Sequence, residues 1–227
     1  MNDQFNGHAI APEDPRGAAA EAFWRRENLR FVEPHYRLLK AARIVSKLAQ
    51  GRAACSLLDV GCGPATLSRV LPANIDYYGI DIAIQNPAPN LREADLRVAP
   101  IKFGDMRFDV VLAQGVFEYV GDTQSKKFKE VAEILTDNGR FVVSYWNFGH
   151  RNTEMYHAFS NVQPLDDFRT DLSRYFKVER SFPASHNWRH TGPNRRVTRA
   201  INMPVNVHIP LISPVLAVEY FFICAPG

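Results

Sequence analysis

The sequence predicts an α/β domain with a doubly wound sheet of seven strands, mostly parallel and with an antiparallel last strand. From Cys55 onward, short apolar runs alternate with stretches of helical periodicity, which is typical of βαβ units. Runs such as Val110–Ala113 are apolar on both faces, as strands are when helices cover both sides of a sheet. The length of 227 residues and the apolar content of 46% fit one domain with a sizeable core.

The amino-terminal part of the chain is predicted to be helical after a flexible lead. Residues 1–16 contain two prolines and several small polar residues, and we predict no regular structure there. Apolar residues recur at helical spacing further on, and helices are predicted over Gly17–Leu29 and Pro34–Gln50. These amino-terminal helices, within residues 17–50, begin a single domain that extends over residues 17–227.

Seven strands and three further helices are predicted in the remainder of the domain. The predicted strands are Ser56–Val60, Tyr77–Asp81, Asn90–Asp95, Phe108–Ala113, Arg140–Tyr145, Phe176–Phe182 and Leu216–Cys224. The predicted helices between them are Ala65–Leu71, Ser125–Leu135 and Leu165–Tyr175. The pair Asn138-Gly139 predicts the turn that leads into the fifth strand, because both residues are common in turns.

A long interval separates the last two predicted strands. Residues 183–215 are rich in Pro, Asn, Arg and His, and a loop of this length inside a compact domain is usually functional or has its own structure. We therefore predict a lid-like insertion that faces the substrate. Arginine binds carboxylate and phosphate in a forked geometry, so this segment predicts an acidic substrate, with a solvated basic surface as the alternative. The candidate substrate-binding residues are Arg189, Arg195 and Arg196.

Composition and charge argue against several classes of protein. The formal net charge of +3 is weak evidence for a nucleic-acid partner, because such a surface needs clustered charge, and we expect no nucleic-acid partner. Cys55, Cys62 and Cys224 lie far apart and form no C-x-x-C pair, which argues against a disulfide framework or a metal site and fits a cytoplasmic location. The amino terminus lacks the apolar segment of a signal peptide, and no apolar run is long enough to span a membrane.

A glycine-rich turn follows the first predicted strand. Gly61 and Gly63 let the backbone approach a ligand closely, because glycine has no Cβ. In an open α/β sheet, ligands bind at the carboxyl ends of the strands, where this turn lies. Asp81 ends the next strand, and an acid at that place accepts hydrogen bonds from ribose hydroxyls. The glycine turn and the acid together predict an adenosine-binding site.

Dinucleotide and S-adenosylmethionine sites share this arrangement, and two positions separate them. The dinucleotide fingerprint G-x-G-x-x-G requires a third small residue, but Thr66 stands there. Asp59, two residues before Gly61, is unfavourable beside a pyrophosphate and suits a ligand that carries an ammonium group. Both positions favour the amino-acid part of S-adenosylmethionine.

Five segments in order resemble the motifs of class I S-adenosylmethionine-dependent methyltransferases. Leu57–Ala65 resembles the D-x-G-x-G first motif, and Asp81 matches the acid that binds the ribose. Arg92–Leu96 resembles the third-strand element, whose acid meets the adenine amino group. Phe108–Val120 resembles the fourth-strand motif, and Leu135–Val143 resembles the turn before the fifth strand. Several motifs at suitable spacing are far more specific than any one of them.

The resemblance covers about residues 36–224 and implies a Rossmann-like methyltransferase fold with S-adenosylmethionine as the cofactor. It implies that Asp95 binds the adenine. Gln114 and Gly115 follow the fourth strand and are expected beside the methionine part of the cofactor, with a simple loop as the alternative. The predicted cofactor-binding residues are Asp59, Gly61, Cys62, Gly63, Asp81, Ile82, Asp95, Leu96, Gln114 and Gly115.

The substrate is expected beyond the methionine end of the cofactor. Tyr145 and Trp146 follow the fifth strand and are expected to wall the substrate pocket, with core packing as the alternative. A general base is needed only if the methyl-accepting group must lose a proton, as a hydroxyl would. Tyr119 stands where many small-molecule members of the family carry His. The candidate catalytic residues are His150, His186 and Tyr119.

The predicted function is methyl transfer to a small-molecule or glycan-like metabolite, at oxygen or nitrogen. Two alternatives stay open: an RNA or protein methyltransferase, and a non-catalytic S-adenosylmethionine-binding protein. Ala113–Val116 lacks the Asn/Asp-Pro-Pro-aromatic tetrad of amino-methylating nucleic-acid families, which argues against base N-methylation. The expected partner is a small molecule, acidic if the arginines bind it, and the sequence predicts no particular oligomeric state.

Overall fold

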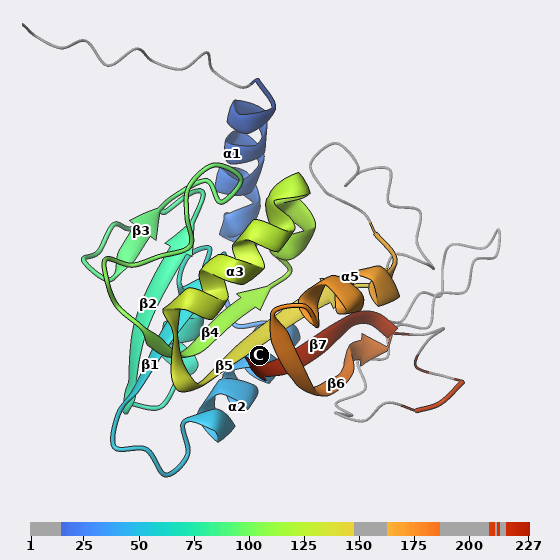
Figure 1. Ribbon diagram of the computed structural model, residues 1–227. Helices are drawn as coiled ribbons and strands as arrows, with labels where there is room; N and C mark the ends of the chain where they lie inside the picture. Colours follow the sequence, from blue (N-terminus) through green and yellow to red (C-terminus); the bar gives the residue numbers. More distant parts are fainter. Residues whose placement is uncertain (1–14, 148–162, 187–208, 212, 214–216) are drawn as a thin grey trace, which may run out of the picture.

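A computed structural model describes residues 15–147, 163–186, 209–211, 213 and 217–227 of the chain (Figure 1). Its centre is one seven-stranded sheet with the strand order β3-β2-β1-β4-β5-β7-β6. Strands β1 to β5 pair in parallel, whereas β7 runs antiparallel to both of its neighbours. The strands are β1 Cys55–Val60, β2 Ile75–Asp81, β3 Leu91–Glu93, β4 Phe108–Gln114, β5 Leu135–Trp146, β6 Phe176–His186 and β7 Ala217–Pro226. The predicted fold class is therefore confirmed.

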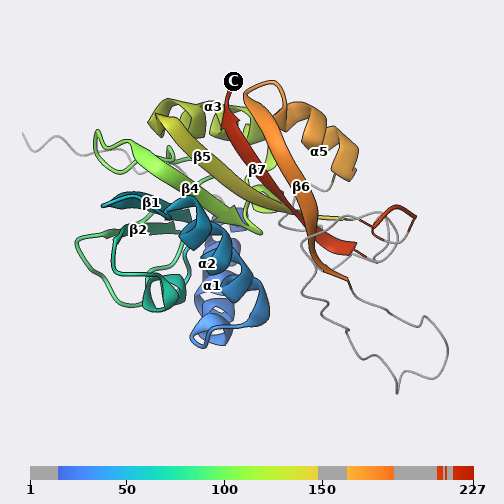
Figure 2. The same ribbon diagram turned by 90° about the horizontal axis from the view of Figure 1, so that it is seen from below.

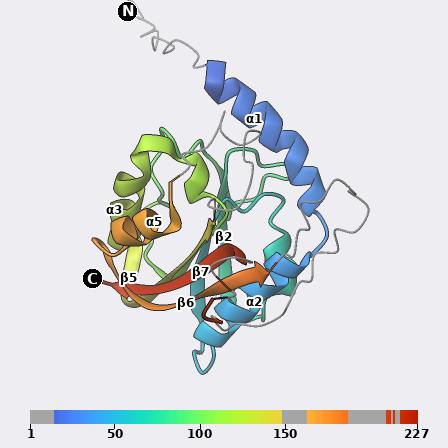
Figure 3. The ribbon, with the colours of Figure 1, turned by 90° about the vertical axis from the view of Figure 1, so that its right-hand side faces the viewer.

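Helices cover both faces of this sheet. Figures 2 and 3 show α3 and α5 on one face, and α1 and α2 on the other. The helices are α1 Pro15–Glu27, α2 Tyr36–Leu48, α3 Gln124–Ile134 and α5 Leu165–Leu172. Short 3-10 helices are η1 Asn28–Phe31, η2 Thr66–Val70, η3 Phe117–Tyr119 and η4 Gly121–Thr123. No helix among the residues described here is long and apolar enough to cross a bilayer.

Two hydrophobic cores lie on opposite faces of the sheet, because successive side chains of a strand alternate between the faces. Leu57 packs in the core with Val45 of α2, whereas its neighbour Leu58 packs in the core with Phe128 of α3. Phe221 and Phe222 of β7 divide in the same way. This alternation explains why the central strands read as continuous apolar runs in the sequence.

Three predicted helices differ from the observed ones for local reasons. The helix predicted at Ala65–Leu71 is only the 3-10 turn η2, since Ala65 takes a left-handed conformation with φ of 55°. The helix predicted from Pro34 begins at Tyr36, because His35 is its N-cap and accepts a hydrogen bond from the backbone of Leu38. The helix predicted to end at Tyr175 stops at Leu172.

The predicted turn and the predicted insertion also need correction. Asn138 and Gly139 lie within β5, in an irregular stretch where the pairing with β4 shifts, so no separate turn is formed. Residues 183–186 of the predicted insertion belong to β6, which continues to pair with β7 up to His186. Residues 187–208 of the insertion, like residues 1–14 of the predicted lead, lie outside the described residues.

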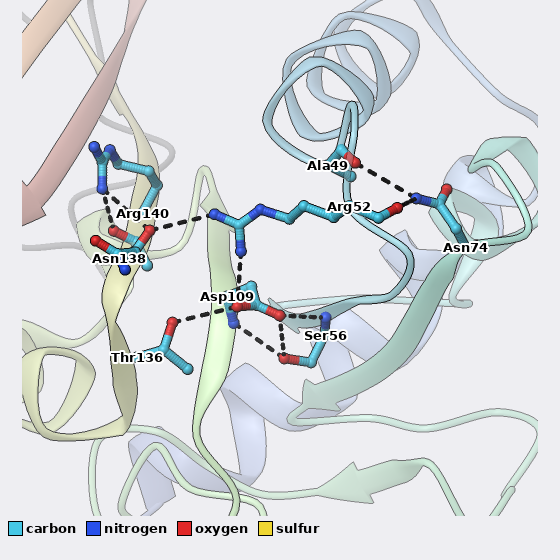
Figure 4. Close-up of polar contacts among 9 residues, drawn as sticks. Ala49, Arg52, Ser56, Asn74, Asp109, Thr136, Asn138 and Arg140 are labelled. Atoms are coloured by element: carbon cyan, nitrogen blue, oxygen red, sulfur yellow. Dashed lines mark hydrogen bonds and ion pairs between the residues drawn. The ribbon is translucent and has the colours of Figure 1, made fainter.

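Asp109 occupies the amino end of β4 and joins three segments there (Figure 4). Its carboxylate accepts hydrogen bonds from Nη1 of Arg52 (2.8 Å), from the backbone of Ser56 (3.0 Å) and from the hydroxyl of Thr136 (3.3 Å). Burial alone would raise the pKa of Asp109, but the hydrogen bonds from Ser56 and the charge of Arg52 lower it below its usual value. The role is structural, as its place at a strand start suggests.

We expect Asp109→Ala to lower the free energy of unfolding by about 2 kcal/mol, because charged hydrogen-bond acceptors contribute roughly that amount. Because the pKa is lowered on folding, this contribution is present above the unfolded pKa and is lost as pH falls through the folded pKa. Urea unfolding at neutral and acidic pH measures both effects. The control is Asp137→Ala, whose side chain is 89% exposed, so a change within about 0.5 kcal/mol is expected. Equal losses in both variants would contradict the assignment.

Candidate active site

One cavity of about 530 Å³ lies at the carboxyl ends of β1, β2 and β4. Its size is within the range of small-molecule sites. Strand order reverses between β1 and β4, and such switch points are where α/β sheets bind ligands. Residues of α1 and η1 cover it. Every residue predicted to bind the cofactor lines this cavity: Asp59, Gly61, Cys62, Gly63, Asp81, Ile82, Asp95, Leu96, Gln114 and Gly115.

The turn after β1 depends on glycine for two reasons. Gly61 has φ of +77°, a left-handed conformation that side chains disfavour. A Cβ at this position would lie 2.2 Å from Cγ2 of Val116, far inside contact distance. The backbone nitrogens of Gly61 and Cys62 both donate to the carbonyl of Ile80, at 2.7 and 3.1 Å, which ties the turn to β2.

Asp81, the last residue of β2, is held as a fixed carboxylate beside this turn. Its Oδ2 accepts from the backbone of Gly63 (2.8 Å), and its Oδ1 accepts from the backbone of Ala83 (2.9 Å) and from Nδ2 of Asn28 (3.1 Å). Burial raises the pKa of Asp81 despite these three donors. Because β1 and β2 are adjacent parallel strands, the carboxylate and the glycine turn face one cavity, as the ribose assignment requires.

Asp59 contributes a second carboxyl group to the cavity. It is 5% exposed, and its Oδ2 accepts a hydrogen bond from the hydroxyl of Tyr77 at 2.8 Å. Burial raises the pKa of Asp59 to about 7, and the nearby charge of Asp81 adds to the shift. Its protonation therefore changes near neutral pH.

Asp95 follows β3 and lines the cavity beside Leu96. Its carboxylate already binds Arg97, whose Nε lies 3.0 Å from Oδ1. Burial would raise the pKa of Asp95, but hydrogen bonds and charge from Arg97 lower it. Asp95 is thus ionised, and its oxygens are shared with Arg97.

The opposite end of the cavity is formed by the segments that follow β4 and β5. Aromatic rings gather there: Trp24 of α1 meets Tyr119 of η3 edge to face at 4.9 Å, and Trp146 ends β5. Gln114 lines the same cavity, and its Nε2 is buried with no hydrogen-bond partner among the described residues. A buried donor of this kind calls for a partner, and a bound ligand is one explanation.

Comparisons with known proteins agree with this geometry. A family model described as a methyltransferase domain matches residues 34–193, which is well over half of the chain. The chain belongs to this methyltransferase family. The matched part includes the glycine turn, Asp81 and the fourth-strand motif, so the resemblance to class I methyltransferases is confirmed, and with it an enzyme that uses S-adenosylmethionine.

Solved structures share the fold of this methyltransferase. Magnesium protoporphyrin IX methyltransferase from Synechocystis PCC 6803, solved with bound S-adenosylmethionine, is 14% identical with a TM-score of 0.59, over 96% of this chain and 100% of that chain. A TehB-like S-adenosylmethionine-dependent methyltransferase from Corynebacterium glutamicum is 13% identical with a TM-score of 0.55, over 95% of this chain and 100% of that chain. The CcbJ methyltransferase from Streptomyces caelestis is 14% identical with a TM-score of 0.57, over 86% of this chain and 91% of that chain. A search of curated proteins finds no match.

The predicted substrate and catalytic residues of the methyltransferase divide into three groups. Tyr119 and Trp146 line the cavity. Tyr145 does not: it is fully buried on the other face of the sheet and stacks on Phe168 at 3.9 Å. Successive side chains of a strand point to opposite faces, so β5 can direct only one of its last two aromatic residues into the cavity. His150, Arg189, Arg195, Arg196 and the side chain of His186 lie outside the described residues.

Sequence reasoning missed the contribution of the amino-terminal segment to the methyltransferase site. Asn28 reaches Asp81 across 53 residues, and Arg37 reaches Glu219 across 182 residues. No local pattern marks such pairs. The lining residues from this segment are Phe23, Trp24, Arg26, Glu27, Asn28, Arg30, Phe31, His35, Arg37 and Leu38.

Proposed function

We propose that the protein transfers a methyl group from S-adenosylmethionine to a small-molecule acceptor, at oxygen or nitrogen. The observation that carries this proposal is one cavity that is lined both by all the predicted cofactor residues and by the aromatic rings of Trp24, Tyr119 and Trp146. The cover formed by α1 and η1 makes the site concave, which favours a small acceptor over a polymer. One structural neighbour is a magnesium protoporphyrin IX methyltransferase, which supports the proposal of a small-molecule acceptor.

The described residues fit the chemical groups of the cofactor. The carboxylate of Asp81 suits the ribose hydroxyls, and Asp59 suits the ammonium of the amino-acid part. The unpartnered Nε2 of Gln114 is a donor for the carboxylate of that part. Asp95 and Leu96 are proposed to hold the adenine. When bound, S-adenosylmethionine supplies a methyl group already activated on a sulfonium, so the protein chiefly orients the acceptor in line with it.

His35 lines the cavity but does not suit the role of general base. Burial lowers its pKa, so the ring is neutral near pH 7. Its Nδ1 accepts a hydrogen bond from the backbone of Leu38 at 3.1 Å, so the ring proton lies on Nε2. His35 therefore offers a donor to the cavity, and no free acceptor. The proposed candidates for a base stay Tyr119, His150 and His186.

Cofactor affinity is expected to fall as the medium becomes acidic. Ammonium binding requires the ionised form of Asp59, whose pKa is about 7. The affinity should therefore drop roughly tenfold per pH unit below this pKa and level off above it. Calorimetry with S-adenosylhomocysteine between about pH 6 and 8 measures the slope. Asp59→Asn should bind S-adenosylhomocysteine weakly, and its affinity should depend little on pH in this interval. If the variant keeps the slope of the wild type, Asp59 is not the source of the pH dependence.

The proposed function is tested by following a labelled methyl group. The protein is incubated with methyl-labelled S-adenosylmethionine and, separately, with a small-metabolite fraction, RNA and protein from a cell extract. We expect label in the small-metabolite fraction. Label in RNA or protein would replace the proposed acceptor class, and tight cofactor binding without transfer to any fraction would indicate a binding protein without turnover.

A further inference from the structure

A buried charged network underlies the aromatic end of the cavity. Nε and Nη2 of Arg37, on α2, donate to both carboxylate oxygens of Glu219, on β7, at 2.7 and 2.6 Å. Glu219 is 1% exposed and also accepts from the hydroxyl of Ser144, on β5. The backbone nitrogen of Gly115 donates to that hydroxyl at 2.9 Å. The network thus fixes the guanidinium against the turn that follows β4.

This ion pair by itself is expected to contribute little to the free energy of unfolding. Removing a carboxylate and a guanidinium from water is unfavourable, and pairing them often does no more than offset that loss. Yet Arg37 also lines the cavity. Its side chain is 29% exposed, and its Nη1 makes no hydrogen bond with any residue that the structure describes. Gly115, with φ of +66°, leaves room for the guanidinium, since a Cβ there would lie 3.2 Å from Nη2.

Aromatic rings line the same cavity as Arg37. The guanidinium carbon of Arg37 lies 5.8 Å from the ring centre of Trp146. Trp24 and Tyr119 line the same cavity, and their rings meet at 4.9 Å with planes 80° apart. Aromatic side chains bury a planar ligand through face-to-face or edge-to-face contacts, with little loss of side-chain freedom.

The charges at this end favour an oxygen over an ammonium group. The guanidinium of Arg37 is paired by Glu219, and burial would lower its pKa, but the carboxylate holds it above its ordinary value. Glu118 is 1% exposed, and burial raises its pKa to about 8, so it is largely protonated at neutral pH. From η3, therefore, no ionised carboxylate faces Arg37, and an ammonium group of the acceptor would meet the guanidinium cation.

We infer that the methyl acceptor is a planar aromatic molecule with a hydroxyl or carboxylate oxygen, which Arg37 binds while the rings of Trp24, Tyr119 and Trp146 contact it face-on or edge-on. The inference rests on the proposed function, because it assigns the acceptor of that same site. Guanidinium binds oxygen acceptors through directed N–H groups, which gives orientation as well as affinity. Arg37 is then a substrate-binding residue.

The test compares simple probes in the presence of S-adenosylhomocysteine. Phenol, benzoate, benzylamine and cyclohexanecarboxylate are titrated against the full chain, and binding is followed by tryptophan fluorescence. Benzylamine carries a positive charge where benzoate carries a negative one. Cyclohexanecarboxylate keeps the carboxylate but lacks the aromatic ring. We expect phenol or benzoate to bind at least tenfold more tightly than benzylamine and cyclohexanecarboxylate. Tighter binding of phenol would identify a hydroxyl as the recognised group, and tighter binding of benzoate would identify a carboxylate.

The decisive variant is Arg37→Gln/Glu219→Gln. Arg37→Gln alone leaves Glu219 buried and unpaired, so it is expected to unfold easily. The double variant replaces the ion pair with two neutral amides. We expect it to fold, to bind S-adenosylhomocysteine within twofold of the wild type, and to bind the preferred probe about tenfold or more weakly. Arg43→Gln, at an exposed residue of α2 that does not line the cavity, should change neither affinity.

The outcomes separate this inference from the proposed function. If the wild type does not bind S-adenosylhomocysteine, the proposed function fails and the inference falls with it. If it binds but shows no preference for phenol or benzoate, or if the folded double variant keeps that preference, Arg37 has only a structural role. If the double variant does not fold, Arg37→Lys is titrated in its place, and unchanged probe affinity there overturns the inference, because lysine lacks the forked donors.

Discussion

Asp81→Ala is expected to weaken the binding of S-adenosylmethionine by at least tenfold. The carboxylate is held by donors from Gly63, Ala83 and Asn28, so it meets a ligand in a fixed position. A hydrogen bond to a charged group contributes about 1.5–3 kcal/mol, which corresponds to roughly tenfold to a hundredfold in affinity. Calorimetry with the wild type and the variant, both shown to be folded by circular dichroism, measures the difference.

The control for this experiment lies on the same strand. Asp76 is exposed near the amino end of β2, away from the cavity, so Asp76→Ala should leave the affinity unchanged. Asp81→Ala also leaves the buried backbone donors of Gly63 and Ala83 without this acceptor, and a lower melting temperature is expected. Unchanged cofactor binding in folded Asp81→Ala would remove the ribose assignment.

Gly61→Ala is expected to damage both the fold and the cofactor site. The left-handed conformation costs an alanine about 1–2 kcal/mol. In addition, the new methyl group would lie 2.2 Å from Cγ2 of Val116, a branched side chain that rotates with difficulty. Either Val116 or the turn must move, and both line the cavity. We expect a larger loss of stability than strain alone would cause, and a loss of more than tenfold in affinity for S-adenosylmethionine.

Two further variants separate the strain from the clash. Gly104→Ala has a comparable φ of +58° but no atom within 4 Å of the new Cβ, so it should lose only about 1–2 kcal/mol of stability and no affinity. Gly61→Ala/Val116→Ala removes the obstructing methyl group and should recover part of the affinity. If Gly61→Ala and Gly104→Ala behave alike in thermal unfolding and calorimetry, the close approach to Val116 is not what requires glycine.

The cofactor half of the site was predictable from the sequence because its signals are local. Gly61 and Gly63 follow a strand by one and three residues, and Asp81 ends the next strand, so the parallel pairing of β1 and β2 brings them together. The absence of the third glycine of the dinucleotide fingerprint is also visible in the sequence, because Thr66 occupies that position. In the structure its hydroxyl donates to the carbonyl of Phe31 and thereby ties η2 to the amino-terminal segment.

The acceptor half was harder to predict because it depends on contacts between distant segments. Whether Tyr145 or Trp146 faces the cavity depends on the register of β5, and an irregular pairing near Asn138 and Gly139 precedes it. No sequence pattern marks Arg37 as part of the site, since its partner Glu219 is 182 residues away. Backbone conformation at Ala65 likewise turned a predicted helix into a short 3-10 turn.

The most direct measurement is a crystal structure of the protein with S-adenosylhomocysteine. We expect both ribose hydroxyls within about 3.2 Å of the carboxylate of Asp81, and the amino-acid part against the turn at Gly61 and Gly63. The sulfur should point toward the end of the cavity that Tyr119 and Trp146 line. A nucleoside bound elsewhere, or a ribose that makes no contact with Asp81, would contradict the proposed site.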